Sequence, residues 1–136
     1  MGDTIRQVDY FYMLVPNRAG EGARILRTLK DAGANLVAFS GFPEQRRAQL
    51  DFFPADPAAF RSVAKANKWK VVGPKRGLLI HGDDRVGAVA DIVGTLADAK
   101  IDVTAISAVS MDGRYGALCW VAPRNLKKAM LVLGAR

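Results

Sequence analysis

The chain has 136 residues, of which 20 are Lys or Arg and 13 are Asp or Glu, so its formal charge at pH 7 is +7. Half of the residues are hydrophobic and 24% are charged, which excludes a disordered polyelectrolyte and a fibrous protein. The length excludes a large multidomain enzyme. It leaves room for one domain, or for two small units that share a core, because a unit of about 65 residues is marginal alone.

The first residues predict a strand, a turn and a helix. Residues 8–15 are dense in β-branched and aromatic side chains, which favours a strand, and Pro16 and Gly20 mark the turn that follows. Small and apolar residues then recur at helical spacing, which predicts an amphipathic helix. They are Gly22, Ile25, Leu26, Leu29 and Ala32. This helix needs a sheet beneath it, since each buried apolar side chain contributes roughly 1.5–3 kcal/mol before conformational entropy is counted.

The rest of the first half predicts strands and a second helix. Three further strands are expected, at residues 36–42, 48–53 and 70–72. The first two are joined by a loose charged connection at 44–47. Asp56 and Pro57 are suited to the N-cap and the first position of a helix that Phe60 and neighbouring apolar residues carry. Residues 73–75 predict a linker.

The second half repeats this order. Sliding the chain on itself by 67 positions places residues 17–40 over 84–107, and 10 of the 24 pairs are identical, where chance gives about one or two. The second copy predicts strands at 77–81, 103–109 and 117–121 and helices at 89–99 and 126–133. Asp112 and Gly113 predict a hairpin turn. The two copies are residues 1–73 and 74–136, and the chain stops where the last strand of the second copy is due.

The pattern is βαββαβ followed by βαββα, which predicts an α+β fold of two tandem ferredoxin-like units. Each unit is expected to form an antiparallel sheet with both helices on one face. Because the second copy lacks its last strand, the edge of its first strand is exposed, and exposed edges attract another strand. We expect that edge to pair with the other copy or with a second chain.

Few residues in the sequence suit catalysis or metal binding. Cys119 is the only cysteine and His81 the only histidine, which excludes internal disulfides, cysteine-bound metals and multi-histidine sites. Cys119 is expected to be a buried small hydrophobe, and Asp83 and Asp84 are adjacent in a turn. No apolar run reaches the roughly 20 residues of a membrane helix, and residues 1–8 lack a signal-peptide core. We expect a cytoplasmic protein with no enzyme activity, no metal, no cofactor and no membrane partner.

The two turns resemble a family motif. NRAG at 17–20 and DRVG at 84–87 are similar to the turn of the ACT domain, the amino-acid-sensing regulatory module of enzymes such as aspartate kinase and phosphoglycerate dehydrogenase. Ala19 and Val86 replace the proline common in that turn. Asn35, and Asp102 as an acid, match an Asn that often opens the second strand of the domain. The histidine that precedes the turn in some serine-binding members is absent.

The resemblance implies a ligand site in each copy, at the turn and at the start of the second strand. The implied ligand-binding residues are Asn17, Arg18, Ala19, Gly20, Asn35, Leu36, Asp84, Arg85, Val86, Gly87, Asp102 and Val103. Elementary chemistry agrees, because the unpaired N–H groups and partial positive charge of a helix N-terminus attract a carboxylate. The polar side chains can accept from an ammonium group. The alternative is that Asn17 and Asp84 only cap their helices.

We therefore predict a regulatory protein, tandem ACT-like and homodimeric, that binds an amino acid or a similar small ligand and acts on a partner enzyme. One alternative is a ligand-independent module that docks through the incomplete sheet edge. Another is RNA binding, for which the positive charge and residues 114–120 are an incomplete match, because Leu118 breaks the required aromatic alternation.

Overall fold

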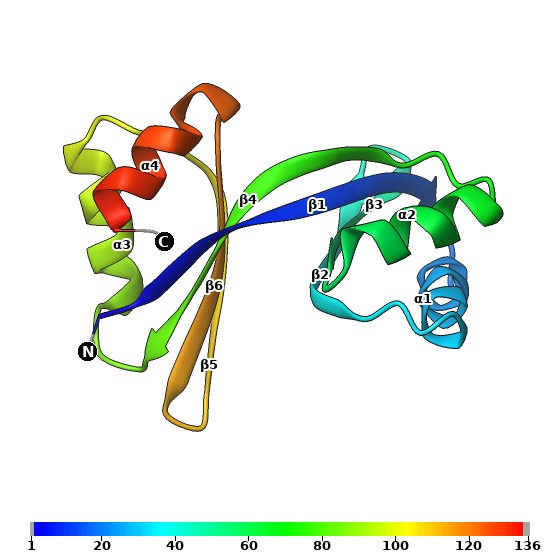
Figure 1. Cartoon of the computed structure of the whole chain (residues 1–136), viewed down its shortest axis with the longest axis horizontal. Helices are drawn as coiled ribbons and strands as arrows, with labels where there is room; N and C mark the ends of the chain where they lie inside the picture. The colour runs from blue at the N-terminus through cyan, green and yellow to red at the C-terminus, as the bar shows by residue number, and fades with distance from the viewer. Residues whose placement is uncertain (1, 135–136) are drawn as a thin grey trace. The chain divides into compact units, whose positions relative to one another are not determined.

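The computed structural model describes residues 2–134 of the chain (Figure 1). The strands are β1 (Thr4–Pro16), β2 (Leu36–Glu44), β3 (Arg47–Pro54), β4 (Val72–Asp83), β5 (Val103–Met111) and β6 (Arg114–Val121). The helices are α1 (Glu21–Asp31), α2 (Pro57–Ala66), α3 (Ala88–Asp98) and α4 (Leu126–Leu133), with a 3₁₀ turn at Pro123–Asn125 before α4.

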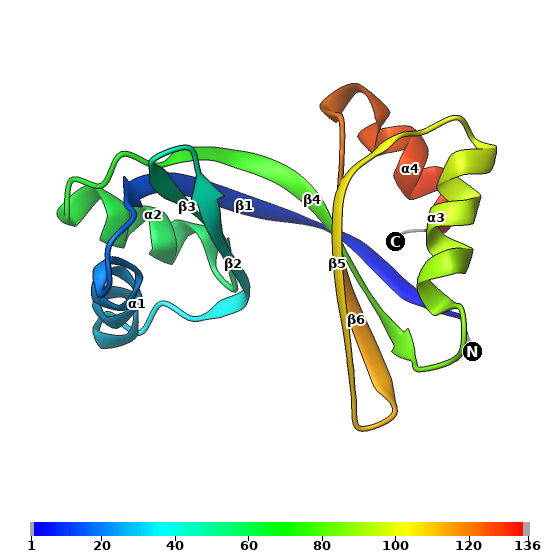
Figure 2. The ribbon, with the colours of Figure 1, turned by 180° about the vertical axis from the view of Figure 1, so that it is seen from behind.

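The chain forms two compact units that share β1 and β4. The continuous unit is Asp9–Lys75, and the split unit joins residues 2–8 to residues 76–134. The strand order is β2-β3-β1-β4 in the continuous unit and β1-β4-β6-β5 in the split unit. In each unit both helices lie on one face of the strands (Figures 1 and 2). The predicted fold class, α+β with tandem ferredoxin-like units, is confirmed.

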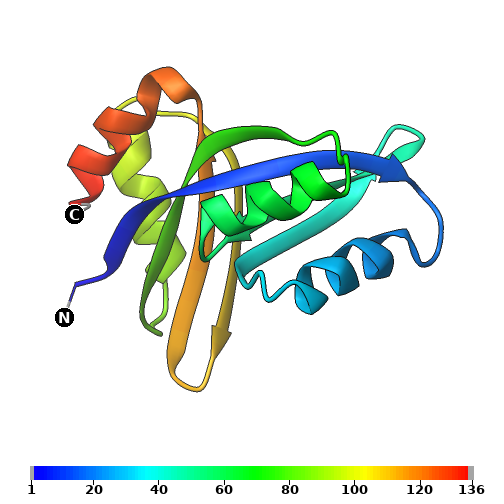
Figure 3. The ribbon, with the colours of Figure 1, turned by 45° about the vertical axis from the view of Figure 1, so that its right-hand side comes forward.

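Helix–sheet packing forms the core of the continuous unit (Figure 3). Ile25 and Leu29 of α1 and Phe60 of α2 are at most 2% exposed. They pack on side chains from β1 and β3, which are Phe11, Met13, Val15, Leu50 and Phe52. These strand residues are two apart in each strand because alternate side chains point to opposite faces. The helical stripe predicted from the sequence is therefore the buried one.

The split unit has an equivalent core. Leu78 and Ile80 of β4 and Leu96 of α3 are fully buried, together with Ile92 and with Ala129 of α4. The same cluster includes Ile5, which is 4% exposed. A residue from the start of the chain thus belongs to the core of the second copy.

The edge left open by the missing strand is covered by the chain itself. β1 begins at Thr4, four residues earlier than predicted, and its first residues lie beside β4. Asp3 lies against Gly82, whereas Tyr10 lies against Gly73, so β1 and β4 run antiparallel. Of the two predicted ways to cover this edge, pairing with the other copy is confirmed. The alternative of a ligand-independent module that docks through this edge loses its docking edge, because residues 4–8 occupy it.

The predicted linker at 73–75 is wrong, because β4 runs through it without interruption. The strand expected at 77–81 lies within β4. Of the strand expected at 70–72, only Val72 belongs to β4, and residues 70 and 71 precede it. Gly73 has φ 140°, and a Cβ there would lie 2.8 Å from the backbone oxygen of Tyr10. Glycine in this strand therefore permits the close approach of β1 rather than a flexible connection.

The local turn chemistry is mostly as predicted. Asp56 caps α2 by accepting from the amide of Ala58 at 3.0 Å, and Asp112 and Gly113 adopt φ 54° and 77° in the β5–β6 hairpin. The expected loose connection at 44–47 is instead an equally tight turn, with Gln45 at φ 57°. A positive φ is uncommon for glutamine, which is why the sequence does not indicate it.

Replacing Ile5 with alanine tests the position of the first residues. Loss of a buried isoleucine should lower the free energy of unfolding by about 2–5 kcal/mol. The exposed neighbour Arg6 is the matched control, and Arg6→Ala should change it by less than about 0.5 kcal/mol. Urea denaturation measures both variants. Equal stability of Ile5→Ala and wild type would show that residues 4–8 are not part of the core.

Candidate functional site

The two predicted turns lead into helices that no side chain caps. The N-cap residues are Gly20, at φ 90°, and Gly87, at φ 82°, and neither helix receives a side-chain cap hydrogen bond. Asn17 and Asp84 precede these glycines by three residues, and both are exposed. The alternative that they serve only as helix caps is therefore wrong. The amides of Glu21 and Ala88 donate to the carbonyl oxygens of Arg18 and Arg85, both at 3.3 Å, and the N-cap supplies no side-chain acceptor for the amides that follow.

In the first copy, an ion-pair cluster occupies the exposed turn. Glu21, at the start of α1, accepts from Arg18 Nη2 at 3.0 Å and from Arg24 Nη2 at 2.9 Å. The hydrogen bonds from Arg24 and Arg18 hold the pKa of Glu21 below its ordinary value. Ala19 and Gly20 are exposed beside this cluster. A carboxylate ligand at this turn meets two arginines that already share one acidic partner.

In the second copy, the equivalent arginine has a partner from the start of the chain. Arg85 Nη1 and Nη2 each lie 3.1 Å from one oxygen of Asp3, and Nη2 also lies 3.2 Å from Oδ2 of Asp91. The hydrogen bonds that Arg85 donates to Asp3 are the main cause of the raised pKa of Arg85. The Asp3 side chain is 10% exposed, compared with 69% for Asp91. Asp3 is therefore the enclosed partner of the guanidinium.

Tyr115 and Gly82 surround this ion pair. The Arg85 guanidinium lies 5.9 Å from the centre of the Tyr115 ring, a cation–π distance. The Tyr115 hydroxyl is buried and has no hydrogen-bond partner within residues 2–134. Burial is the main cause of its raised pKa, to which the Asp3 carboxylate adds. A Cβ at Gly82 would clash with Asp3, so glycine leaves the space that the carboxylate occupies.

A hollow of about 270 Å³ opens beside the second turn. Its lining includes Asp84, Arg85 and Gly87 from the turn, and Ser110 and Tyr115 from β5 and β6. Val86 is fully exposed at the tip of the turn and does not line the hollow. Three of the four predicted turn residues thus face one surface depression at the start of α3.

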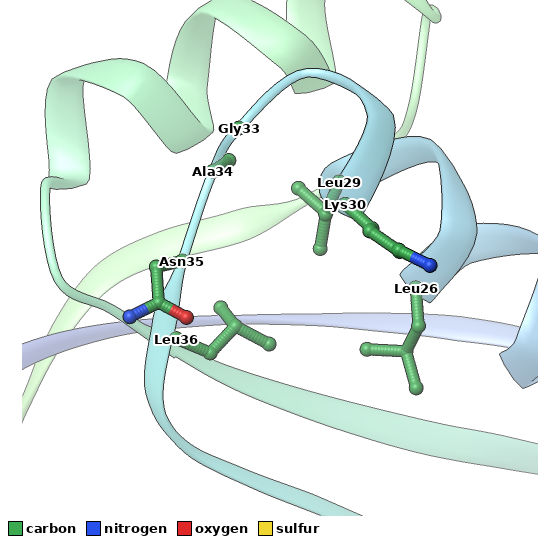
Figure 4. Close-up of a pocket in the computed structure, with 7 residues that line it drawn as sticks. All are labelled: Leu26, Leu29, Lys30, Gly33, Ala34, Asn35 and Leu36. Atoms are coloured by element: carbon green, nitrogen blue, oxygen red, sulfur yellow. The ribbon is translucent and has the colours of Figure 1, made fainter.

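The strand-start residues of the first copy line a different hollow, of about 340 Å³ (Figure 4). The side chains of Leu26, Leu29 and Leu36 give it an apolar wall, with the Asn35 amide at one end and Lys30 at the other. In the second copy, Asp102 is exposed and Val103 is half-buried against the core. The strand starts therefore differ between the copies in shape and in charge.

Within one unit, the turn and the strand start do not meet. They lie at opposite ends of α1 or α3, each an 11-residue helix about 16 Å long. The hollow at Asn35 and Leu36 includes none of residues 17–20, and the hollow at Arg85 includes neither Asp102 nor Val103. Within one unit, a single small ligand therefore does not touch both parts of the predicted site.

The candidate catalytic residues lack an activating environment. Cys119 is 1% exposed, as predicted, and burial raises the pKa of its thiol to about 11. His81 is exposed, and its Nδ1 lies 3.2 Å from Arg114 Nη2.

Across residues 2–134, no group of three His, Cys, Asp or Glu side chains is placed to hold a metal ion. Nor does any helix in that range have the length and apolar character to cross a membrane.

The helix-free face of the continuous unit is partly buried, because Tyr12 is half-buried and Leu14 is 41% exposed there. Tyr10 and Phe53 stack with ring centres 5.0 Å apart, and they are 8% and 0% exposed. Asp51 is 5% exposed on the same face and accepts from Gln49 Nε2 at 2.9 Å. Burial raises the pKa of Asp51. Tyr10 and Phe53 are thus enclosed, whereas Tyr12, opposite Asp51 in the β1–β3 pair, is half-buried.

Sequence reasoning missed Asp3 and Tyr115 as neighbours of the second turn. One signal was available, because the repeat aligns Gly82 with Val15, and a glycine within a strand indicates close approach of another group. The partner was not predictable, since residue 3 is 82 positions away from Arg85 in the chain.

Comparison with known proteins supports the fold. No family model matches the sequence, and no curated protein does. Among solved structures, a protein from Bacteroides thetaiotaomicron aligns with TM-score 0.83 at 17% identity, over 97% of this chain and 88% of its own. The alpha and beta subunits of an aspartokinase align with TM-score 0.68 at 18% identity, over 98% and 95%. The ligand-free regulatory subunit of aspartate kinase from Thermus thermophilus gives 0.67 at 13%, over the same shares.

These similarities confirm the predicted resemblance to the ACT domain at the level of the fold. The alignments extend over nearly the whole chain, so they include both copies and not only a single unit. The neighbours named above from aspartate kinases include regulatory subunits. At these identities the likeness defines a fold class, the tandem ACT-like fold.

The Asp3–Arg85 pair predicts a specific dependence of stability on pH. Arg85 is the main cause that holds the pKa of Asp3 below its ordinary 3.8, with Tyr115 and His81 adding, while burial opposes them. A carboxylate with a lowered folded pKa stabilises the protein above its unfolded pKa, and this contribution is lost as the pH falls through the folded value. Asp3→Asn should therefore cost about 1.5–3 kcal/mol at pH 7 and progressively less below about pH 4.

Urea denaturation of wild type and Asp3→Asn from pH 7 to pH 2 measures this difference. Asp91→Asn is the control, because its exposed pair with Arg85 should contribute less than about 1 kcal/mol. A difference between Asp3→Asn and wild type that persists unchanged at pH 2 would contradict the assignment.

Proposed function

We propose that this protein is a non-catalytic regulator that binds an amino acid or a similar small zwitterion. The observation that carries the proposal is the pair of helix N-termini at Gly20 and Gly87, which no side chain caps. In both copies an arginine follows the first polar residue of the turn. Free amides and a guanidinium suit a carboxylate, and the amide or acid of Asn17 and Asp84 suits an ammonium group.

The distance along each helix supports a ligand that bridges two units. The turn supplies the carboxylate contacts, whereas the strand start supplies Asn35 or Asp102 at the other end of the helix. A ligand held by both favours the arrangement in which the two units are close. It shifts that equilibrium only by its difference in affinity for the two arrangements. A homodimer would supply additional pairs of units, and a partner enzyme in the cytoplasm would sense the shift.

Two observations argue against RNA binding. An RNA-binding sheet stacks bases on exposed aromatic side chains of its central strands. Tyr10 and Phe53 are enclosed, and Tyr115 points into the helix-covered core. The buried carboxyl group of Asp51 beside Tyr12 also opposes a phosphate backbone. The net positive charge is therefore better assigned to the solvent faces of the helices.

Thermal unfolding against the twenty amino acids, each at millimolar concentration, tests the proposal. A ligand at 100 times its dissociation constant adds about 2.7 kcal/mol, which should raise the unfolding midpoint by several degrees. A chemically related group of amino acids is expected to give the shift, and this group would name the ligand class. Stabilisation by RNA with no response to any amino acid would contradict the proposal.

Leucine at Gly20 or Gly87 tests whether the turns bind that ligand. Both positions have positive φ and open space for a Cβ, so the change strains the backbone by about 1–2 kcal/mol and places a side chain at the helix start. Gly134 has the same kind of backbone, at φ 76°, with open space, and Gly134→Leu is the matched control. The ligand-induced shift should disappear only in the turn variants. Its retention in both would place the ligand elsewhere.

A further inference from the structure

The N-terminal segment carries a carboxylate to the arginine of the second turn. Asp3 makes two parallel hydrogen bonds to Arg85, both at 3.1 Å, the bidentate geometry with which a guanidinium binds a free carboxylate. This arginine also lines the hollow at the start of α3. The place that a ligand carboxylate would take on Arg85 is thus filled by the chain.

The surrounding residues favour this contact. Gly82 leaves space for Asp3, and the Tyr115 hydroxyl is enclosed near the pair without a hydrogen-bond partner. Two residues after Asp3, Ile5 is buried in the core of the split unit. Asp3 is therefore held on Arg85 by the pairing of β1 with β4 and by the packing of Ile5, in addition to its own charge.

The first copy has no equivalent contact among the described residues. Arg18, in the turn, pairs at 3.0 Å with Glu21 at the start of the helix that follows, and the Glu21 side chain is 15% exposed. Val15 stands where the second copy has Gly82, so the space that Asp3 uses is absent. The two repeats thus differ in one respect that matters for a ligand: the guanidinium of the second copy is engaged by an enclosed carboxylate from another strand.

We infer that Asp3 is a tethered competitor for the second site, so that a small carboxylate binds Arg85 only when Asp3 leaves it and the first residues of β1 loosen from β4. At the first turn the acidic partner of Arg18 is its near neighbour Glu21, so ligand binding there does not require a strand to loosen. Because β1 continues from residue 4 to residue 16, displacement of Asp3 acts on a strand that belongs to both units. This inference rests on the proposed function only for the carboxylate character of the ligand.

Acetate is the minimal probe of this competition. The Nε–H resonance of Arg85, assigned by its loss in Arg85→Lys, is followed by NMR in the full chain during titration with sodium acetate, with sodium chloride matching the ionic strength. If Asp3 occupies Arg85 more than nine-tenths of the time, Asp3→Asn should tighten the apparent acetate affinity at least about tenfold. Asp91→Asn is the matched control, since it removes the exposed acidic partner of Arg85, and it should remain near the wild-type affinity.

Amide hydrogen exchange of residues 4–8 provides the second readout. Exchange should be faster in Asp3→Asn than in wild type or Asp91→Asn, and acetate should accelerate it in the wild type more than chloride does. Equal acetate affinity in wild type and Asp3→Asn would overturn the inference. Unchanged exchange of residues 4–8 in Asp3→Asn would also overturn it. Failure of every amino acid to shift the unfolding midpoint would reject the proposed function but leave these two results valid.

Discussion

The pairing of β1 with β4 is the constraint on which the rest of the structure depends. Both strands run through two compact units, so each unit takes two of its four strands from segments that also serve the other. Residues 74–136 contribute β4, β5 and β6 to the split unit, and residues 4–8 lie beside β4 as its fourth strand. A unit of this size is marginal in isolation. The shared strands therefore explain how two incomplete or marginal units form one stable chain.

The same pairing gives the two ligand-site candidates different chemistry. The first turn has an exposed arginine cluster around Glu21, whereas Arg85 in the second turn is engaged by Asp3 from the completing strand. The repeat in the sequence is close at these positions, with Arg18 matching Arg85 and Gly20 matching Gly87. The difference between the partners of the two arginines arises from Gly82 and from the segment beside it. Two copies of one turn motif can thus have unequal surroundings without a change in the motif.

Much of the fold follows from local patterns in the sequence. The helical stripe ending in Leu29, the Asp56 cap and the Asp112–Gly113 turn are determined by neighbours within a few residues, and all were predictable. Gly73 was misassigned to a linker because its role depends on Tyr10, 63 positions earlier in the chain. Asp3 was missed for the same reason. The structural role of a glycine or of a short polar segment depends on which distant segment pairs with it. One sequence alone does not reveal that segment.

Differential scanning calorimetry of the full chain tests the dependence on shared strands most directly. If β1 and β4 bind the two units into one cooperative structure, the chain should unfold in a single transition, with equal calorimetric and van't Hoff enthalpies. Two resolved transitions, each with about half of the total enthalpy, would contradict this account, because they would show that each unit is stable while the other is unfolded.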